Sequence, residues 1–141
     1  MDIARQLALI DELCFRPFPA EHGPSCPGHL TAVLASSHGL RGGDPGERAV
    51  TVEDYEKERD ALCERLAERW GEPDLWNLQT VLLRTEREEI PEPWAGLSAR
   101  ARVAYLWDAQ GTGRRLAVAV ADRDEADEVQ LLAVVTEEAL P

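Results

Sequence analysis

The last third of the chain contains three short apolar runs separated by polar, turn-forming residues, and this pattern constrains the fold more than any other. The runs are Ala101–Trp107, Leu116–Ala121 and Val129–Thr136. Apolar runs of this length that alternate with turns are typical of an antiparallel β-meander. Because a meander must bury at least one face against another layer, the sequence predicts an α+β fold with a hydrophobic core.

Residues within these runs alternate between two faces, as expected for strands that face a core. The larger apolar side chains share one face, with two alanines among them: Ala101, Val103, Tyr105, Trp107, Leu116, Val118, Val120, Val129, Leu131, Ala133 and Val135. The opposite face carries small residues: Ala104, Ala117, Ala119 and Ala121. Small side chains let a neighbouring element approach closely, so we expect a tightly packed helix there, or a thin second layer.

Two amphipathic helices are predicted before the meander. Apolar residues recur at helical spacing over Asp2–Cys14. The clearer helix opens at Thr51, which forms a capping-box-like pattern with Asp54. It runs to Trp70, and Gly71 is the residue that ends it. Its buried stripe comprises Val52, Tyr55, Leu62, Leu66 and Trp70.

Two further segments are less clearly patterned. Leu30–Ser37 fits either a short helix or a buried strand, because periodicity cannot separate the two at this length, and we favour the helix. Leu75–Arg84 is apolar enough to be the first strand of the sheet, ahead of the meander. The sequence therefore predicts N-terminal helices and one long amphipathic helix packed on a four-stranded, mainly antiparallel C-terminal sheet.

The 141 residues fit a single α+β domain, with mobile Gly- and Pro-rich loops near 17–28 and 40–48. No apolar run approaches the roughly 20 residues that a membrane span needs. Asp2 precedes the first basic residue and Asp11 follows soon after, which argues against a secretory signal peptide. We therefore expect a cytoplasmic protein that does not act at a membrane.

The net charge of −12 is distributed unevenly. Residues 51–75 hold nine acids against four bases, and residues 101–141 hold eight against four. Such a surface repels phosphate backbones, so nucleic-acid binding is disfavoured, whereas a basic protein partner is electrostatically favoured. The same acidity also serves solubility without any partner. Fourteen of the 15 basic residues are arginine, a bias that codon usage in a GC-rich, actinobacterial-like genome explains.

A group of histidines and cysteines near the N-terminus is the only metal candidate. Cys14, His22, Cys26 and His29 are residue types that bind zinc, and a Gly- and Pro-rich loop can wrap a metal. However, the spacing matches no common zinc framework, and Cys14 closes an apolar helical stripe where a buried thiol is ordinary. We retain His22, Cys26 and His29 as weak metal candidates and predict no resident metal or cofactor. The odd number of cysteines favours reduced thiols.

The remaining polar clusters do not form a catalytic motif. The acidic turn Asp122–Glu128 lacks the register of an EF-hand calcium loop. Gly111–Gly113 stands between two strands, which predicts a hairpin turn rather than a phosphate-binding loop. The carboxylates that fall near predicted strand ends are Glu86, Glu88, Glu89 and Asp108. With no catalytic or cofactor fingerprint, the sequence favours a binding role over an enzymatic one.

The four tryptophans divide into two pairs. Trp70 and Trp107 lie in register with apolar stripes and are expected in the core. Trp76 and Trp94 flank turn residues, where a half-exposed ring can anchor an interface. The candidate interaction residues are Trp76, Trp94, Glu53, Asp60, Glu64, Asp124 and Asp127.

The leading hypothesis is a small acidic protein that binds another macromolecule, in an inhibitor, immunity-like or adaptor role toward a basic partner. The alternative is a ligand- or metal-binding, or enzymatic, domain with a pocket between the long helix and the sheet. A third hypothesis is self-association through a sheet edge, because a meander leaves unpaired backbone groups at its rim.

Overall fold

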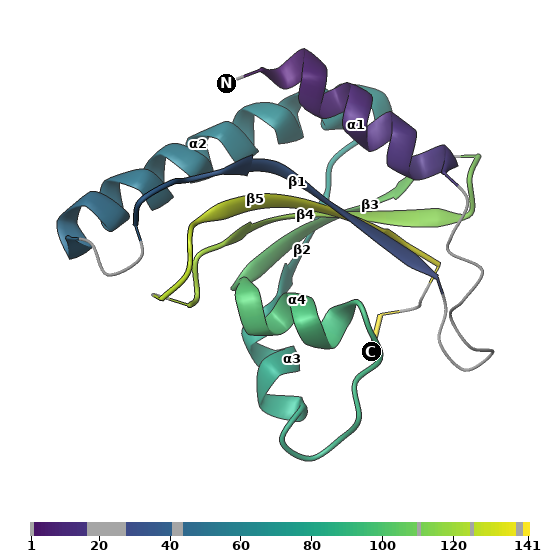
Figure 1. Ribbon diagram of the computed structural model, residues 1–141. Coiled ribbons are helices and arrows are strands. Elements are labelled where there is room, and N and C mark those ends of the chain that lie inside the picture. The colour runs from purple at the N-terminus through teal and green to yellow at the C-terminus, as the bar shows by residue number, and fades with distance from the viewer. Residues whose placement is uncertain (1, 17–27, 41–43, 110, 125, 138–139) are drawn as a thin grey trace.

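The computed structural model describes residues 2–16, 28–40, 44–109, 111–124, 126–137 and 140–141. Within them the chain forms four helices and five strands (Figure 1). In chain order the elements are α1 (Ile3–Phe15), β1 (His29–Ser36), α2 (Pro45–Trp70), β2 (Asp74–Asn77), α3 (Leu78–Arg84), α4 (Trp94–Arg100), β3 (Val103–Ala109), β4 (Arg114–Ala121) and β5 (Gln130–Thr136). The α+β class predicted from the sequence is confirmed.

All five strands form one antiparallel sheet in the order β1-β5-β4-β3-β2. β3, β4 and β5 are the predicted meander. The two edges come from earlier segments of the chain, since β1 pairs with β5 and β2 pairs with β3. The sheet therefore has five strands rather than the predicted four, because the segment before the long helix adds an edge strand.

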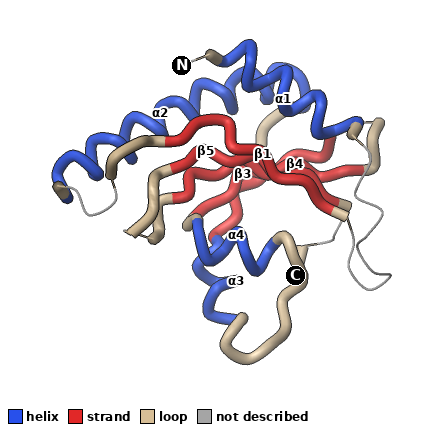
Figure 2. Tube along the Cα trace, in the orientation of Figure 1, coloured by secondary structure: helices blue, strands red, loops and turns tan. Residues whose placement is uncertain are grey.

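Helices cover both faces of this sheet (Figure 2). α1 and α2 pack on the face with the larger apolar side chains, where Trp107, Leu116 and Val118 belong to one buried cluster. α3 and α4 pack on the face of small residues, where Ala117 and Ala119 belong to a second cluster. The predicted close packing of a helix over the alanines is thus confirmed. Ala101 is the exception to the predicted faces, because it precedes β3 and packs into the second cluster.

Local signals explain where the long helices begin and end. The Asp2 carboxylate accepts a hydrogen bond from the Arg5 backbone N–H at 3.0 Å and caps α1. Asp44 caps α2 in the same way and is followed by Pro45, whose fixed φ suits the first helical position. Gly71 ends α2 with a φ of 85°, a conformation that glycine adopts without strain. The predicted helix start at Thr51 is therefore too late, because Asp44 and Pro45 form the stronger signal.

Leu30–Ser37, which the sequence favours as a helix, is almost entirely the strand β1. The register of β1 against β5 is regular apart from a shift between Val33 and Ala35. Leu34 lies at this shift and is buried in the first cluster. The tertiary pairing with β5 decides the conformation of a segment whose own periodicity fits both states.

Leu75–Arg84, which the sequence predicts as one strand, divides at Asn77. β2 ends there, and the Asn77 side chain accepts a hydrogen bond from the Gln79 backbone N–H at 2.9 Å, which caps α3. The apolar residues of α3 then pack on the sheet instead of extending it. α4 was not predicted, because prolines precede it and it has only seven residues.

Several expectations concern residues outside the described part of the chain. Residues 17–27 make up nearly all of the loop predicted near 17–28, and residues 41–43 make up a third of the loop predicted near 40–48. The last part of the second loop, Pro45–Arg48, is the first turn of α2. Of the helices in the described ranges, none is both long enough and apolar enough to cross a lipid bilayer.

Candidate functional site

Four exposed carboxylates form a stripe along α2. Glu53, Glu56, Asp60 and Glu64 follow one another at intervals of three or four residues, which places them on the same side of a helix. Among the described residues, Asp60 is the only one of the four that forms an ion pair, with the adjacent Arg59 at 3.0 Å. We call these four residues the acidic stripe.

The acidic stripe borders a shallow depression between α2 and the sheet. The depression has a volume of about 250 Å³ and is lined by Glu56, Arg59, Arg102, Val103, Val120 and Asp122. The Arg59 guanidinium lies 4.7 Å from the centre of the Tyr105 ring in β3, a cation–π geometry. Through this contact, the side of α2 that carries Arg59 and Glu56 faces β3 and the neighbouring edge strand β2.

The strip of sheet next to the depression is not covered by a helix. Leu75 in β2 pairs with Tyr105 in β3, so the two side chains share the face on which α2 lies. Leu75 is nevertheless 66% exposed and Val103 is 36% exposed. We call Leu75 and Val103 the apolar margin. Large apolar side chains exposed beside polar rims mark interaction sites more often than isolated ones do.

The acidic turn after β4 lies against the first turn of α2 and is held there by Arg48. The Arg48 guanidinium donates hydrogen bonds to three backbone carbonyls. The acceptors are the oxygens of Asp122, Asp124 and Asp127, at 3.0, 2.9 and 2.7 Å. In a calcium loop such carbonyls would bind a metal ion. Here the Arg48 guanidinium lies between them and donates hydrogen bonds to all three. The Asp124 carboxylate accepts a hydrogen bond from the Ala126 backbone N–H, and the Asp122 carboxylate lies 3.9 Å from the Arg102 guanidinium.

A second set of bonds ties the turn to the segment after β1. The Glu128 carboxylate accepts hydrogen bonds from the Leu40 backbone N–H at 3.1 Å and from the Ser37 hydroxyl at 3.3 Å. The Ser37 hydroxyl in turn accepts a bond from the Val129 backbone N–H at 2.9 Å. These partners hold Glu128 in place. Glu128, Asp124 and Asp127 line a second depression of about 250 Å³, together with Ala99 and Arg100 of α4.

The structure thus brings together two acidic segments that lie far apart in the sequence. Glu56 of the acidic stripe and Asp122 of the turn line the same depression. Of the predicted interaction residues, Glu53, Asp60, Glu64 and Asp124 are exposed and Asp127 is partly exposed. We call the acidic stripe and the turn residues Asp122, Asp124 and Asp127 together the acidic surface.

The two tryptophans predicted to be half-exposed differ. Trp76 in β2 is partly buried, and its ring lies edge-on to that of Trp94, with 5.5 Å between the ring centres. Trp94 is 0% exposed and belongs to the second cluster. The prediction of a half-exposed Trp94 is therefore wrong, because α4 turns its first residue into the core instead of leaving it in a loop. Trp107 is buried in the first cluster, as predicted.

The weak metal candidates do not form a site in the part of the chain that is described. His22 and Cys26 lie outside the described residues. His29 begins β1 and lines a small groove of about 140 Å³ beside α4, together with Glu92 and Arg100. Across the described ranges, no three His, Cys, Asp or Glu side chains are placed to hold a metal ion.

Two of the cysteines are buried free thiols. Cys14 and Cys63 lie in the first cluster, on α1 and α2. Burial raises the pKa of the Cys63 thiol to about 12, and burial likewise raises the pKa of Cys14. A thiol that stays protonated above neutral pH is a weak nucleophile, so both residues serve the core.

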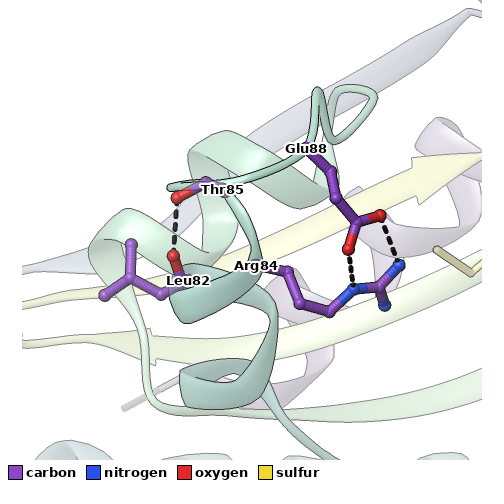
Figure 3. Close-up of polar contacts among 4 residues, drawn as sticks. All are labelled: Leu82, Arg84, Thr85 and Glu88. Atoms are coloured by element: carbon purple, nitrogen blue, oxygen red, sulfur yellow. Dashed lines mark hydrogen bonds and ion pairs between the residues drawn. The ribbon is translucent and has the colours of Figure 1, made fainter.

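The carboxylates after α3 include a well-formed ion pair. The Arg84 guanidinium and the Glu88 carboxylate make two parallel hydrogen bonds of 2.9 and 3.0 Å (Figure 3). The hydrogen bond from Arg84 lowers the pKa of Glu88, although the pair is exposed. Next to it, the Thr85 hydroxyl donates to the Leu82 carbonyl at 2.6 Å and closes the helix end (Figure 3). These contacts stabilise the turn after α3.

The glycine-rich segment between β3 and β4 is the predicted hairpin turn. Gly111 and Gly113 have φ values of 82° and 73°, which glycine adopts readily. The two arginines that follow have structural partners. Arg114 donates to the Leu13 carbonyl at the end of α1 at 2.7 Å, and Arg115 pairs with Asp108 at 3.4 Å.

Sequence reasoning missed Arg48, Leu75 and Val103. Arg48 falls in a segment that composition marks as a loop, and its partners are backbone carbonyls, which no side-chain motif reveals. In the sequence, Leu75 and Val103 look like ordinary strand residues. They are exposed in the structure because α2 does not cover them.

The fold and the surface define a three-layer α+β protein with an acidic, partly apolar face. No protein-family model matches the chain, and no match is found among curated proteins or solved structures.

Proposed function

We propose that the protein binds a second protein that presents basic side chains, and that the acidic surface and the apolar margin form the contact. The observation that carries the proposal is that Glu56 of the acidic stripe and Asp122 of the acidic turn line one depression, whose wall also contains Arg59, Arg102 and Val103. Carboxylates and apolar side chains are therefore offered to a partner on the same side of the sheet.

Each half of this surface contributes a different part of the binding free energy. The carboxylates steer a basic partner and favour it over acidic ones, an effect that salt screens over about 10 Å at 0.1 M. The apolar margin loses water on contact and holds the complex at higher salt. An inhibitor, immunity-like or adaptor role toward a basic partner in the cytoplasm fits this combination. Trp76, at the same sheet edge, is a further candidate contact.

The test compares three proteins in capture experiments from a lysate, read by quantitative mass spectrometry. The first is the wild type, and the second carries Glu53→Gln, Asp60→Asn and Glu64→Gln. The matched control carries Glu86→Gln, Glu89→Gln and Glu137→Gln, which remove the same charge at exposed positions outside the acidic surface.

We expect partners of the wild type to be enriched in basic proteins, to be lost from the stripe variant and to be kept by the control. Release of the same partners by moderate salt should accompany this result. Equal losses from both variants would show a general charge effect, and partners without a basic bias would contradict the proposal.

A small-ligand role is the second candidate, and the depression between α2 and the sheet favours it. Arg102 lies 3.9 Å from Asp122 there, so one small space offers both a guanidinium and carboxylates. A zwitterionic metabolite such as a free amino acid matches that polarity. Thermal-shift screening of amino acids should then find a stabilising ligand whose effect Arg102→Ala removes. A screen in which no amino acid stabilises the wild type speaks against this role.

A further inference from the structure

We propose that β1 pairs with the β1 strand of a second copy of this chain, which joins two five-stranded sheets about a twofold axis. This interface lies at the edge of the sheet opposite β2, so it is independent of the acidic surface. It also gives a definite location to the self-association through a sheet edge that the sequence suggests.

β1 is an edge strand whose first five residues lack charge, proline and a bulge, since the register shift comes only after Val33. In the described residues, β5 is the only strand with which it pairs, so its other side presents backbone N–H and C=O groups. Edge strands normally carry charged residues or proline, or are very short. β1 has eight residues, HLTAVLAS, with no Asp, Glu, Lys, Arg or Pro among them.

The opposite edge is protected by comparison. β2 has only four residues and begins with Asp74, whose side chain is exposed. A strand this short offers few backbone groups to a neighbouring chain. The two edges of the sheet therefore differ in length and charge, which are the properties that favour or oppose the addition of another strand.

The register shift in β1 limits the segment that can pair and sets the expected alignment. The regular part is His29–Val33, because the shift follows Val33. Its central residue is Thr31, so an antiparallel twofold pairing places Thr31 opposite its own copy. Threonine pairs across neighbouring strands are favourable. The same alignment places Val33, which is 48% exposed, opposite His29.

β1 contains no Asp, Glu, Lys or Arg that would oppose pairing with its own copy. The basic partner proposed above needs carboxylates, and His29–Ser36 contains none. A second β1 strand brings no charge of either sign to the pairing, and the antiparallel pattern of the whole sheet continues through it. The net charge of −12 on each copy is concentrated on other segments, so salt that screens it should strengthen the dimer.

The first test is sedimentation equilibrium over a range of concentrations, in moderate salt. The wild type should form dimers, and Thr31→Lys should raise the dissociation constant by about tenfold or more, because like charges would face each other across the axis. Val33→Lys should act in the same direction. The matched control Leu75→Lys places lysine on the other edge and should leave the dimer intact, as should the stripe variant.

The second test reads the register directly. In a Cys26→Ser background, where the buried Cys14 and Cys63 remain, Thr31→Cys should form a covalent dimer on mild oxidation. Leu75→Cys in the same background should cross-link far less. A wild type that stays monomeric at every concentration overturns the proposal, and so does a dimer that Thr31→Lys and Leu75→Lys weaken equally. Failure here would leave the capture experiment on the acidic surface unaffected.

Discussion

Arg48 shows how one side chain organises the acidic turn. Its guanidinium bonds three carbonyl oxygens that belong to residues 122–127 and draws the turn against α2. Asp124 and Asp127 then line a depression together with Ala99 and Arg100 of α4. The partly buried guanidinium also offsets part of the local acidity.

Replacing Arg48 should therefore destabilise the fold. Arg48→Met leaves the three carbonyls without their donor, and we expect a loss of about 1–3 kcal/mol in the free energy of unfolding. Urea unfolding measures the change. The control Arg65→Met, on the exposed side of the same helix, breaks only a 4.0 Å surface pair and should cost about 0.5 kcal/mol or less. Equal stabilities of the two variants would contradict the role given to Arg48.

Cys63 gives a pH dependence with a defined sign. Burial raises its pKa from 9.0 to about 12, so between these values the unfolded chain loses a proton that the folded protein keeps. Stability is fully present below pH 9 and falls as pH rises through this window. From about pH 8 to about pH 10.5, the wild type should lose about 2 kcal/mol more unfolding free energy than Cys63→Ala.

Denaturant unfolding at several pH values tests this expectation, with the slope against pH as the readout because the substitution also leaves a small cavity. Cys14 and Tyr55 have pKa values raised by burial as well, so a shallower slope remains in the variant. Parallel curves for the two proteins would show that Cys63 is not shielded from solvent.

Among single residues, sequence reasoning succeeded where the cause is local and failed where it is tertiary. The exposure of Glu53 and Glu64 follows from helical spacing, and the burial of Trp107 follows from strand alternation. Trp94 was misplaced because its neighbours are prolines, which suggested a loop. Its burial depends on α4 docking against the alanine face, a contact between segments distant in the chain.

Among the elements, α3 and α4 pack closely on the sheet because the side chains beneath them are small. Ala117 and Ala119 are each 1% exposed beneath α3 and α4. Close packing leaves no room there for added methyl groups. The alternation of large and small residues along β4 therefore decides which face accepts the long helices and which accepts the short ones.

Ala119→Leu should destabilise the protein by about 1–3 kcal/mol, because the added carbons must displace α3 or α4. The exposed Ala99 of α4 provides the control, since Ala99→Leu should change stability by about 0.5 kcal/mol or less. Thermal unfolding of the two variants measures the difference. An Ala119→Leu protein as stable as the control would contradict the tight packing of this layer.

Some helices and strands can be predicted from the sequence and others cannot. β3, β4 and β5 have clear alternation, and α1 has both spacing and a cap, so their existence follows from the chain itself. β1 has no signal that separates strand from helix, and pairing with β5 supplies it. The strand predicted from Leu75 is present as β2, but it ends at Asn77 because α3 begins there. The start of α2 was predicted late because the glycines before Asp44 concealed a strong cap.

For the whole molecule, the arrangement of layers brings one carboxylate from each acidic segment, Glu56 and Asp122, to the same depression. Val103 lines this depression and remains 36% exposed, so an apolar side chain lies beside the two carboxylates. Composition predicted the acidity and its two centres, but their convergence depends on the antiparallel return of β4 beneath α2. The periodicity of the sequence therefore cannot predict that the two acidic segments lie close together.

Hydrogen–deuterium exchange on the complex with a captured basic partner tests the central claim most directly. We expect slower exchange in residues 53–64, 74–77 and 122–127, with residues 29–36 unchanged at equal protein concentration. The protection should disappear in the stripe variant and persist in the Glu86→Gln, Glu89→Gln, Glu137→Gln control. Protection confined to other surfaces, or retained in full by the stripe variant, would contradict the account.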